Sequence, residues 1–128
     1  MKLGIVSLLF ALLLPVIGQA KTPVPEFPAD RIDEAVADSN CPLAMKLLKP
    51  FLDKNHQVAL SSFARWYHFG VCVEQNIEKA IEYYERAVKA GYCAMEARIG
   101  IIYLRGIDVT INIAEAQRRF NKAAICFA

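Results

Sequence analysis

Histidine is scarce in this chain, and the short motifs on which most catalytic and metal sites depend are missing. Among 128 residues there are 2 histidines, His56 and His68, and neither stands in an H-E-x-x-H context or beside a cysteine that it could activate. The sequence has no phosphate-cradling glycine loop and no S-x-x-K or K-T-G motif. It therefore predicts no catalytic residues and no bound cofactor.

A strong charge of either sign is also missing. The chain has 15 basic and 13 acidic residues, for a formal net charge of +2 at pH 7. Such a balance gives no electrostatic reason to expect nucleic acid or an anionic membrane as a partner.

Closely spaced cysteines are absent as well, although the chain has 4 of them: Cys41, Cys72, Cys93 and Cys126. The separations are 31, 21 and 33 residues, unlike the short C-x-x-C spacing of metal sites. The N-terminus indicates export, as described next. An even number of cysteines in a short exported chain predicts two disulfides, with three possible pairings.

The N-terminus has the pattern of an export signal. Lys2 precedes an apolar run from Leu3 to Ile17, and Gly18-Gln19-Ala20 then supplies small side chains at a cleavage site. A membrane-spanning helix needs about 20 apolar residues, and this run is shorter. We therefore expect residues 1–20 to be a signal peptide cleaved after Ala20. The mature protein would be periplasmic or secreted, with no stable membrane insertion.

The rest of the chain is expected to be a proline-rich leader, residues 21–29, followed by one domain, residues 30–128. Shifting this domain by 36 residues superposes similar residues in ten places. These pairs are Phe63/Ile99, Ala64/Gly100, Tyr67/Tyr103, Gly70/Gly106, Val73/Val109, Asn76/Asn112, Ile77/Ile113, Ala80/Ala116, Tyr84/Phe120 and Ala87/Ala123. A third, degenerate copy precedes them, so the units lie at about 28–57, 58–92 and 93–128.

Each copy has the pattern of two helices. Phe63, Ala64 and Tyr67 form one stripe of a first helix, here called helix A, which Gly70 ends. A second helix, helix B, follows each of three asparagines, which are good N-cap residues: Asn40, Asn76 and Asn112. The sequence therefore predicts an all-α fold, an α/α solenoid of about three helix-turn-helix repeats.

Three stretches carry a family resemblance. Residues 63–70 and 99–106 resemble an L-G-x-x-Y-x-x-G signature, and residues 79–87 match K-A-x-x-Y-Y-x-x-A. The chain thus resembles the Sel-1-like repeat, a relative of the tetratricopeptide repeat. The resemblance is good over residues 58–124 and poor over 28–57, where Pro50 also lies inside the second expected helix.

The resemblance implies a non-catalytic adaptor or scaffold of the bacterial cell envelope that binds a protein partner. An assembly factor, an immunity protein and a host-directed binding factor all remain open. The alternative is an enzyme, because cysteine-rich Sel-1-like proteins have been connected with β-lactams and peptidoglycan fragments. That branch pairs cysteines across the two helices of each repeat at short spacing, which this chain lacks.

The helix positions select one disulfide pairing. Cys41 lies at the start of helix B in the first unit, and Cys72 lies in the loop between helices A and B of the next. Cys93 opens the last helix A, and Cys126 closes the last helix B. Because antiparallel helices bring such ends together, we predict Cys41–Cys72 and Cys93–Cys126.

A partner is expected on the concave side, which the helices A line with the positions turned away from helix B. These are Ser61, Arg65, His68 and Phe69 in one unit, and Ala97, Ile101, Leu104 and Arg105 in the next. Trp66 and its counterpart Ile102 are expected in the core instead. Ile101 and Leu104 have an alternative role, packing on the neighbouring helix A.

Carboxylates also recur along the second helix B. Glu74, Glu78, Glu82 and Glu85 lie near Lys79 and Arg86 at helical spacing. The simplest interpretation is a solvated charged face and not a site.

Overall fold

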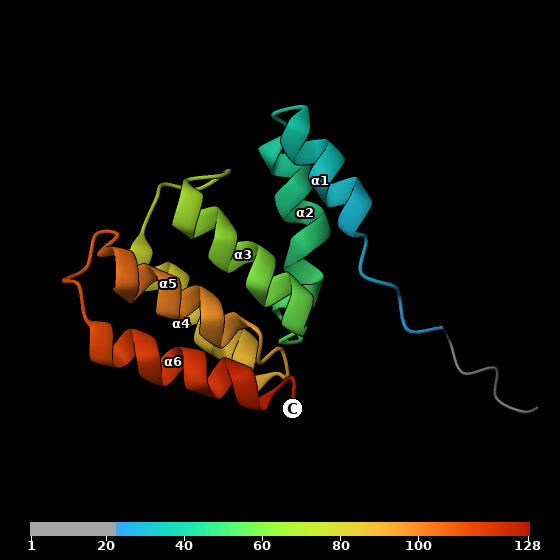
Figure 1. Cartoon of the computed structure of the whole chain (residues 1–128). Helices are drawn as coiled ribbons and strands as arrows, with labels where there is room; N and C mark the ends of the chain where they lie inside the picture. The colour runs from blue at the N-terminus through green and yellow to red at the C-terminus, as the bar shows by residue number, and fades with distance from the viewer. Residues whose placement is uncertain (1–22) are drawn as a thin grey trace, which may run out of the picture.

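The computed structural model describes residues 23–128, and six helices form in that part of the chain (Figure 1). The signal peptide expected at residues 1–20, its cleavage after Ala20, and the start of the leader lie outside the described residues. The helices are α1 (Ala29–Ala37), α2 (Cys41–Leu52), α3 (Gln57–Phe69), α4 (Ile77–Lys89), α5 (Met95–Arg105) and α6 (Ile113–Ile125).

The helices pair in chain order as α1 with α2, α3 with α4, and α5 with α6, and each packs most extensively on its own partner. Contacts of α2 with α3 and of α4 with α5 join consecutive pairs into one array (Figure 1). The interface of α2 with α3 is much smaller than that of α4 with α5. The predicted all-α solenoid is confirmed, with helices A as α1, α3 and α5 and helices B as α2, α4 and α6.

The helix ends form where the sequence predicts them. The side chains of Asn40, Asn76 and Asn112 accept hydrogen bonds from backbone N–H groups three residues on, at 3.2, 2.9 and 2.9 Å. Each such cap stabilises its helix by about 1 kcal/mol. Gly70 and Gly106 end α3 and α5 in the left-handed conformation, with φ of 68° and 65°. Most other residues would be strained there.

The core lies between the helices in two clusters. One joins the second and third pairs and contains the fully buried side chains of Leu60, Tyr84, Ile99 and Ile102. Close approach of α5 and α6 requires Gly100, because a Cβ atom there would lie 2.8 Å from the Phe120 ring.

The second cluster joins the first two pairs and includes Ile32, Leu48, Phe63 and Trp66. Trp66 is therefore a core residue, as expected, and so is its counterpart Ile102. Half-buried Leu52, Tyr67 and Tyr83 pack against both clusters and so link them into one hydrophobic layer.

Both predicted disulfides are present. Cys41 pairs with Cys72 at a Cα–Cα distance of 5.2 Å, which ties the first helix pair to the second. Cys93 pairs with Cys126 at 6.2 Å and joins the start of the last helix A to the end of the last helix B.

The first unit is less regular than the others. Its helix α1 spans 9 residues and begins at Ala29, within the expected leader. Pro50 lies inside α2, which nevertheless continues to Leu52. Before α1, Phe27 stacks on the ring of His56 with 5.2 Å between centroids, and this contact fixes the chain before the first helix.

Candidate functional site

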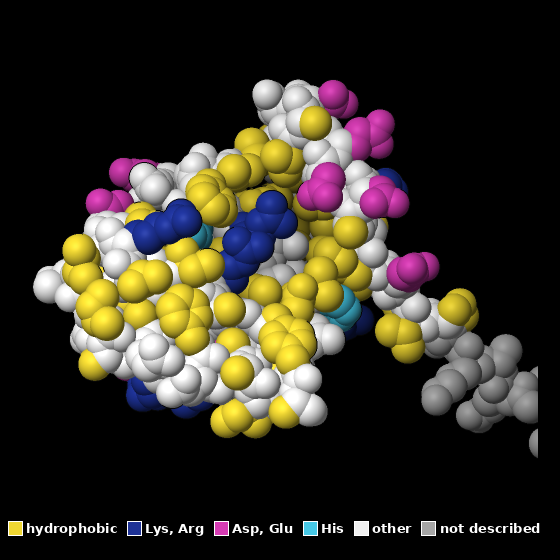
Figure 2. All heavy atoms as spheres, in the orientation of Figure 1, with side chains coloured by type: hydrophobic (Ala, Val, Ile, Leu, Met, Phe, Trp, Pro, Cys, Tyr) yellow, Lys and Arg dark blue, Asp and Glu magenta, His cyan; other side chains and the backbone are white. Residues whose placement is uncertain are grey.

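The helices α1, α3 and α5 expose a common side, which we call the A-helix face. On it Phe69 and Leu104 keep 61% and 43% of their surface exposed, although both are large and apolar. The neighbouring arginines Arg65 and Arg105 are exposed too. Figure 2 shows Lys and Arg side chains in the middle of this face with hydrophobic side chains around them.

Two of the residues predicted for a partner-binding site are buried. Ser61 is 6% exposed, and its hydroxyl donates to the Val58 carbonyl at 2.9 Å. His68 is also 6% exposed, and its Nδ1 lies 3.3 Å from the hydroxyl oxygen of Tyr84 on α4. Both polar groups already have partners inside the fold, so these two side chains are not available to a partner.

The other six predicted residues lie at or near the surface. Arg65, Phe69, Leu104 and Arg105 are exposed, and Ala97 and Ile101 are half-buried. Neither Ile101 nor Leu104 belongs to the two hydrophobic clusters or to the half-buried residues packed on them. Their side chains are therefore not part of the hydrophobic core.

His68 links the core to this face. Burial, with a further contribution from the positive charge of Arg98, holds the pKa of His68 below its ordinary value of 6.5. Burial raises the pKa of its neighbour Tyr84. The neutral imidazole stacks on Phe69 with 4.2 Å between ring centroids and holds that exposed ring in place.

Arg98 is a residue of this face that the sequence analysis missed. It is exposed on α5, and its counterpart one repeat earlier is Ser62, so the repeat comparison gave no hint of a charge there. The usable signal was its spacing: Arg98 and Arg105 are 7 residues apart, which places them on one side of a helix about 10 Å from each other.

A hollow beside Arg65 lies between α1 and α3. Ile32 and Trp66 are its most buried lining residues, Val36 and Phe69 also line it, and Arg65 borders it toward the rest of the face. Asp33 borders it from the α1 side. The hollow is thus mainly apolar, with an acidic group on one side and a basic one on the other.

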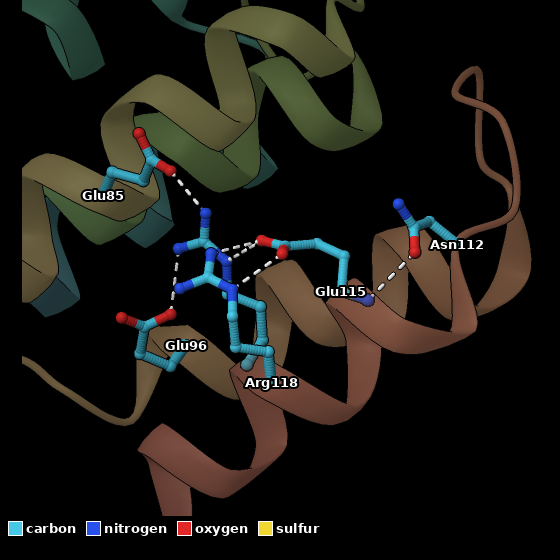
Figure 3. A network of polar contacts seen from close by, with 6 residues as sticks. Glu85, Glu96, Asn112, Glu115 and Arg118 are labelled. Atoms are coloured by element: carbon cyan, nitrogen blue, oxygen red, sulfur yellow. Dashed lines mark hydrogen bonds and ion pairs between the residues drawn. The ribbon is translucent and has the colours of Figure 1, made fainter.

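A second polar cluster lies elsewhere, where α4, α5 and α6 meet (Figure 3). Arg119 of α6 donates to three carboxylates, one on each helix: Glu85 at 2.7 Å, Glu96 at 3.0 Å and Glu115 at 2.7 Å. Arg118 also donates to Glu115, at 2.6 Å. The bonds from Arg118, which has the larger effect, and from Arg119 lower the pKa of Glu115 to about 2. Burial acts to lower the pKa of Arg119, but its bonds to the three carboxylates outweigh burial and raise that pKa above its ordinary value.

The helix B carboxylates were interpreted as a solvated charged face, and for Glu85 this cluster shows that the interpretation is wrong. That residue is an ion-pair partner of Arg119 and links α4 to α6. Lys79 and Arg86 form no ion pair within the described residues; they lie over the rings of Tyr67 and Tyr83.

The repeat comparison held a signal for the cluster. Glu96 and Arg119 occupy the positions of Leu60 and Tyr83 in the previous copy, so a charged pair replaces two residues of the hydrophobic layer. Two opposite charges that appear together at inward positions indicate a buried ion pair.

No group of three or more His, Cys, Asp and Glu side chains within residues 23–128 is arranged to hold a metal ion. None of the helices in this range has the length and hydropathy needed to cross a membrane.

Comparison with known families agrees with the helix pairs. The family model described as Sel1 repeat matches residues 57–92 and 94–125, which cover more than half of the chain. The chain therefore belongs to the Sel1 repeat family. Sel1 repeats are generally protein-interaction and scaffold modules and are typically non-enzymatic. No curated protein matches the sequence.

Proposed function

We propose that this chain is a non-catalytic adaptor of the bacterial cell envelope, which holds a protein partner on its A-helix face. The observation that carries the proposal is the exposure of Phe69 and Leu104 beside Arg65 and Arg105 on one side of the array. Aromatic, aliphatic and arginine side chains at the centre of a surface are the mixture found in protein interfaces.

The rigidity of the face supports this function. Phe69 rests on the buried His68, which in turn contacts Tyr84 of α4. The exposed Phe69 ring is therefore held before any partner arrives, which reduces the entropy lost on binding.

The two disulfides support the location. Disulfides persist in oxidising compartments such as the periplasm and the extracellular space, and both pairs here tie helix ends together. We therefore place the working protein in the periplasm or outside the cell, after removal of the predicted signal peptide.

The test is capture of the partner by a double variant, Arg65→Ala with Leu104→Ala. Both side chains are exposed, so the fold should survive while partner capture is lost. The matched control is Glu78→Ala with Glu82→Ala, two exposed residues of α4. Retention of the partner at full yield by the first variant, or its loss by the control alone, would contradict binding at the A-helix face.

A further inference from the structure

Arg119 and the arginines of the A-helix face have opposite charge surroundings. Arg119 on α6 meets three carboxylates, two of which reach it from other helices. By contrast, Arg65, Arg98 and Arg105 on the A-helix face form no ion pair with any of residues 23–128. The A-helix face thus has three arginines without an ion-pair partner among residues 23–128, although the net charge of the whole chain is only +2.

The A-helix face also changes character from one edge to the other. Toward α1 it has the apolar hollow, where Asp33 stands at the border. Toward α5 it has Arg98 and Arg105, with the half-buried Ile101 between them in sequence. A ligand that lies across the face therefore meets an apolar site first and a cationic site second.

We infer that the A-helix face binds an extended acidic segment of its protein partner, with one apolar side chain in the hollow between α1 and α3 and carboxylates on Arg65, Arg98 and Arg105. This inference rests on the proposed function and names the partner's chemistry. Asp33 fixes the orientation, because it repels carboxylates from the α1 edge while Arg98 and Arg105 attract them at the α5 edge.

The arginine spacing sets the spacing of the ligand charges. Arg98 and Arg105 lie about 10 Å apart along α5, at 1.5 Å per residue. In an extended peptide of polyproline II conformation about 3.1 Å separates successive residues and three residues make one turn, so side chains three positions apart lie on the same side and span nearly the same distance. The preferred segment therefore has two Asp or Glu residues three positions apart, with the apolar residue outside that pair.

A peptide fits these observations better than the other common polyanions. Nucleic acids and anionic membranes attract proteins through dense negative charge and favour broad basic surfaces. Here the cationic site is small, and its neighbours are the apolar residues Phe69, Ile101 and Leu104. Carboxylate recognition by the planar guanidinium group together with apolar contact is the pattern of peptide recognition.

The experiment is a selection of displayed random dodecapeptides on the disulfide-bonded chain. Enriched peptides should combine an apolar residue with two acidic residues three positions apart. A synthetic peptide of the enriched sequence, labelled with fluorescein, should then lose affinity about tenfold or more on the triple variant Arg65→Gln, Arg98→Gln, Arg105→Gln. Phe69→Ser should weaken the same peptide through loss of its apolar contact.

The matched control is Lys46→Gln, Lys89→Gln, Lys122→Gln, which removes the same charge from exposed positions on the helices B and should leave affinity unchanged. Enriched peptides without acidic residues, no enrichment at all, or equal affinity for the arginine variant would overturn the inference. So would tighter binding of phosphatidylglycerol vesicles or of an oligothymidylate than of any peptide. If the Arg65/Leu104 variant loses its partner while this selection fails, the adaptor function stands without the acidic segment.

Discussion

Arg119 Nη1 on α6 lies 3.0 Å from Glu96 Oε2 on α5, and both residues are buried. Arg119 also reaches Glu85 on α4, at 2.7 Å, so one guanidinium group joins three helices (Figure 3). The previous repeat has Leu60 and Tyr83 at the positions of Glu96 and Arg119. Equivalent positions of the two repeats thus hold an ion pair in one unit and two residues of the hydrophobic layer in the other.

Because the previous repeat has apolar residues at both positions, removing one partner of the ion pair should destabilise the protein more than replacing both. Arg119→Leu should lower the free energy of unfolding by about 3 kcal/mol, because the Glu96 carboxylate is left buried without its partner. The double variant Glu96→Leu with Arg119→Tyr copies the pair of the previous repeat and should be near wild type or more stable. Urea unfolding followed by circular dichroism measures both. Equal losses in the single and double variants would show that the pair is not the source of the effect.

The pH dependence of stability should report the burial of His68. Its pKa is lowered in the folded state, so the unfolded chain binds the proton more readily. The contribution of His68 to the free energy of unfolding should therefore be fully present above the unfolded-state pKa of about 6.5. It should be lost as the pH drops below that pKa.

The control is His68→Gln, whose amide can still contact the Tyr84 hydroxyl but does not titrate. Between about pH 5 and 6.5 its stability should be flatter than that of the wild type. Glu115 contributes below that window. Because its pKa is lowered from 4.5 to about 2 in the folded protein, its contribution to the free energy of unfolding is lost progressively as the pH falls below about 4.5. Parallel wild-type and variant profiles in urea titrations would contradict this assignment.

The two disulfides should act on different parts of the array. Each closes a loop of about 30 residues and contributes about 3 to 4 kcal/mol in the chain-entropy model. Cys41–Cys72 reinforces the small interface of α2 with α3, so Cys41→Ser with Cys72→Ser should raise amide exchange mainly in α1 and α2.

The companion variant is Cys93→Ser with Cys126→Ser, which should raise exchange in α6 and leave α1 and α2 unchanged. Hydrogen-exchange mass spectrometry distinguishes the two patterns. Uniform loss of protection across all helices in both variants would mean that the units do not respond separately.

Local sequence patterns predicted the helices and the disulfides. They did not predict for every residue whether its side chain faces the core or the solvent. Asn76 caps α4, and Gly70 ends α3, because their chemistry decides those positions alone. His68 was harder, since it is four residues from Ala64, a core position, and three from Arg65, a surface position. Helical spacing alone is consistent with either side, and the contact with Tyr84 from another helix decided it.

The ion cluster was hidden for a related reason. Glu85 stands at the spacing of a solvent-exposed carboxylate on its own helix, and its partner is 34 residues away on α6. A periodic pattern within one helix carries no information on what the next unit places beside it. Arg98 was missed because the repeat comparison favours residues that recur, and Ser62 is its counterpart.

The most direct test of the account is site-specific photocrosslinking in living cells. A photoreactive phenylalanine analogue placed at Phe69 on α3 or Leu104 on α5 should crosslink one protein partner of defined mass. The same analogue at Glu82 on α4 or Gln117 on α6, which are also exposed, should not. Crosslinks to that partner from α4 or α6 with none from Phe69 or Leu104 would contradict the A-helix face as the binding surface.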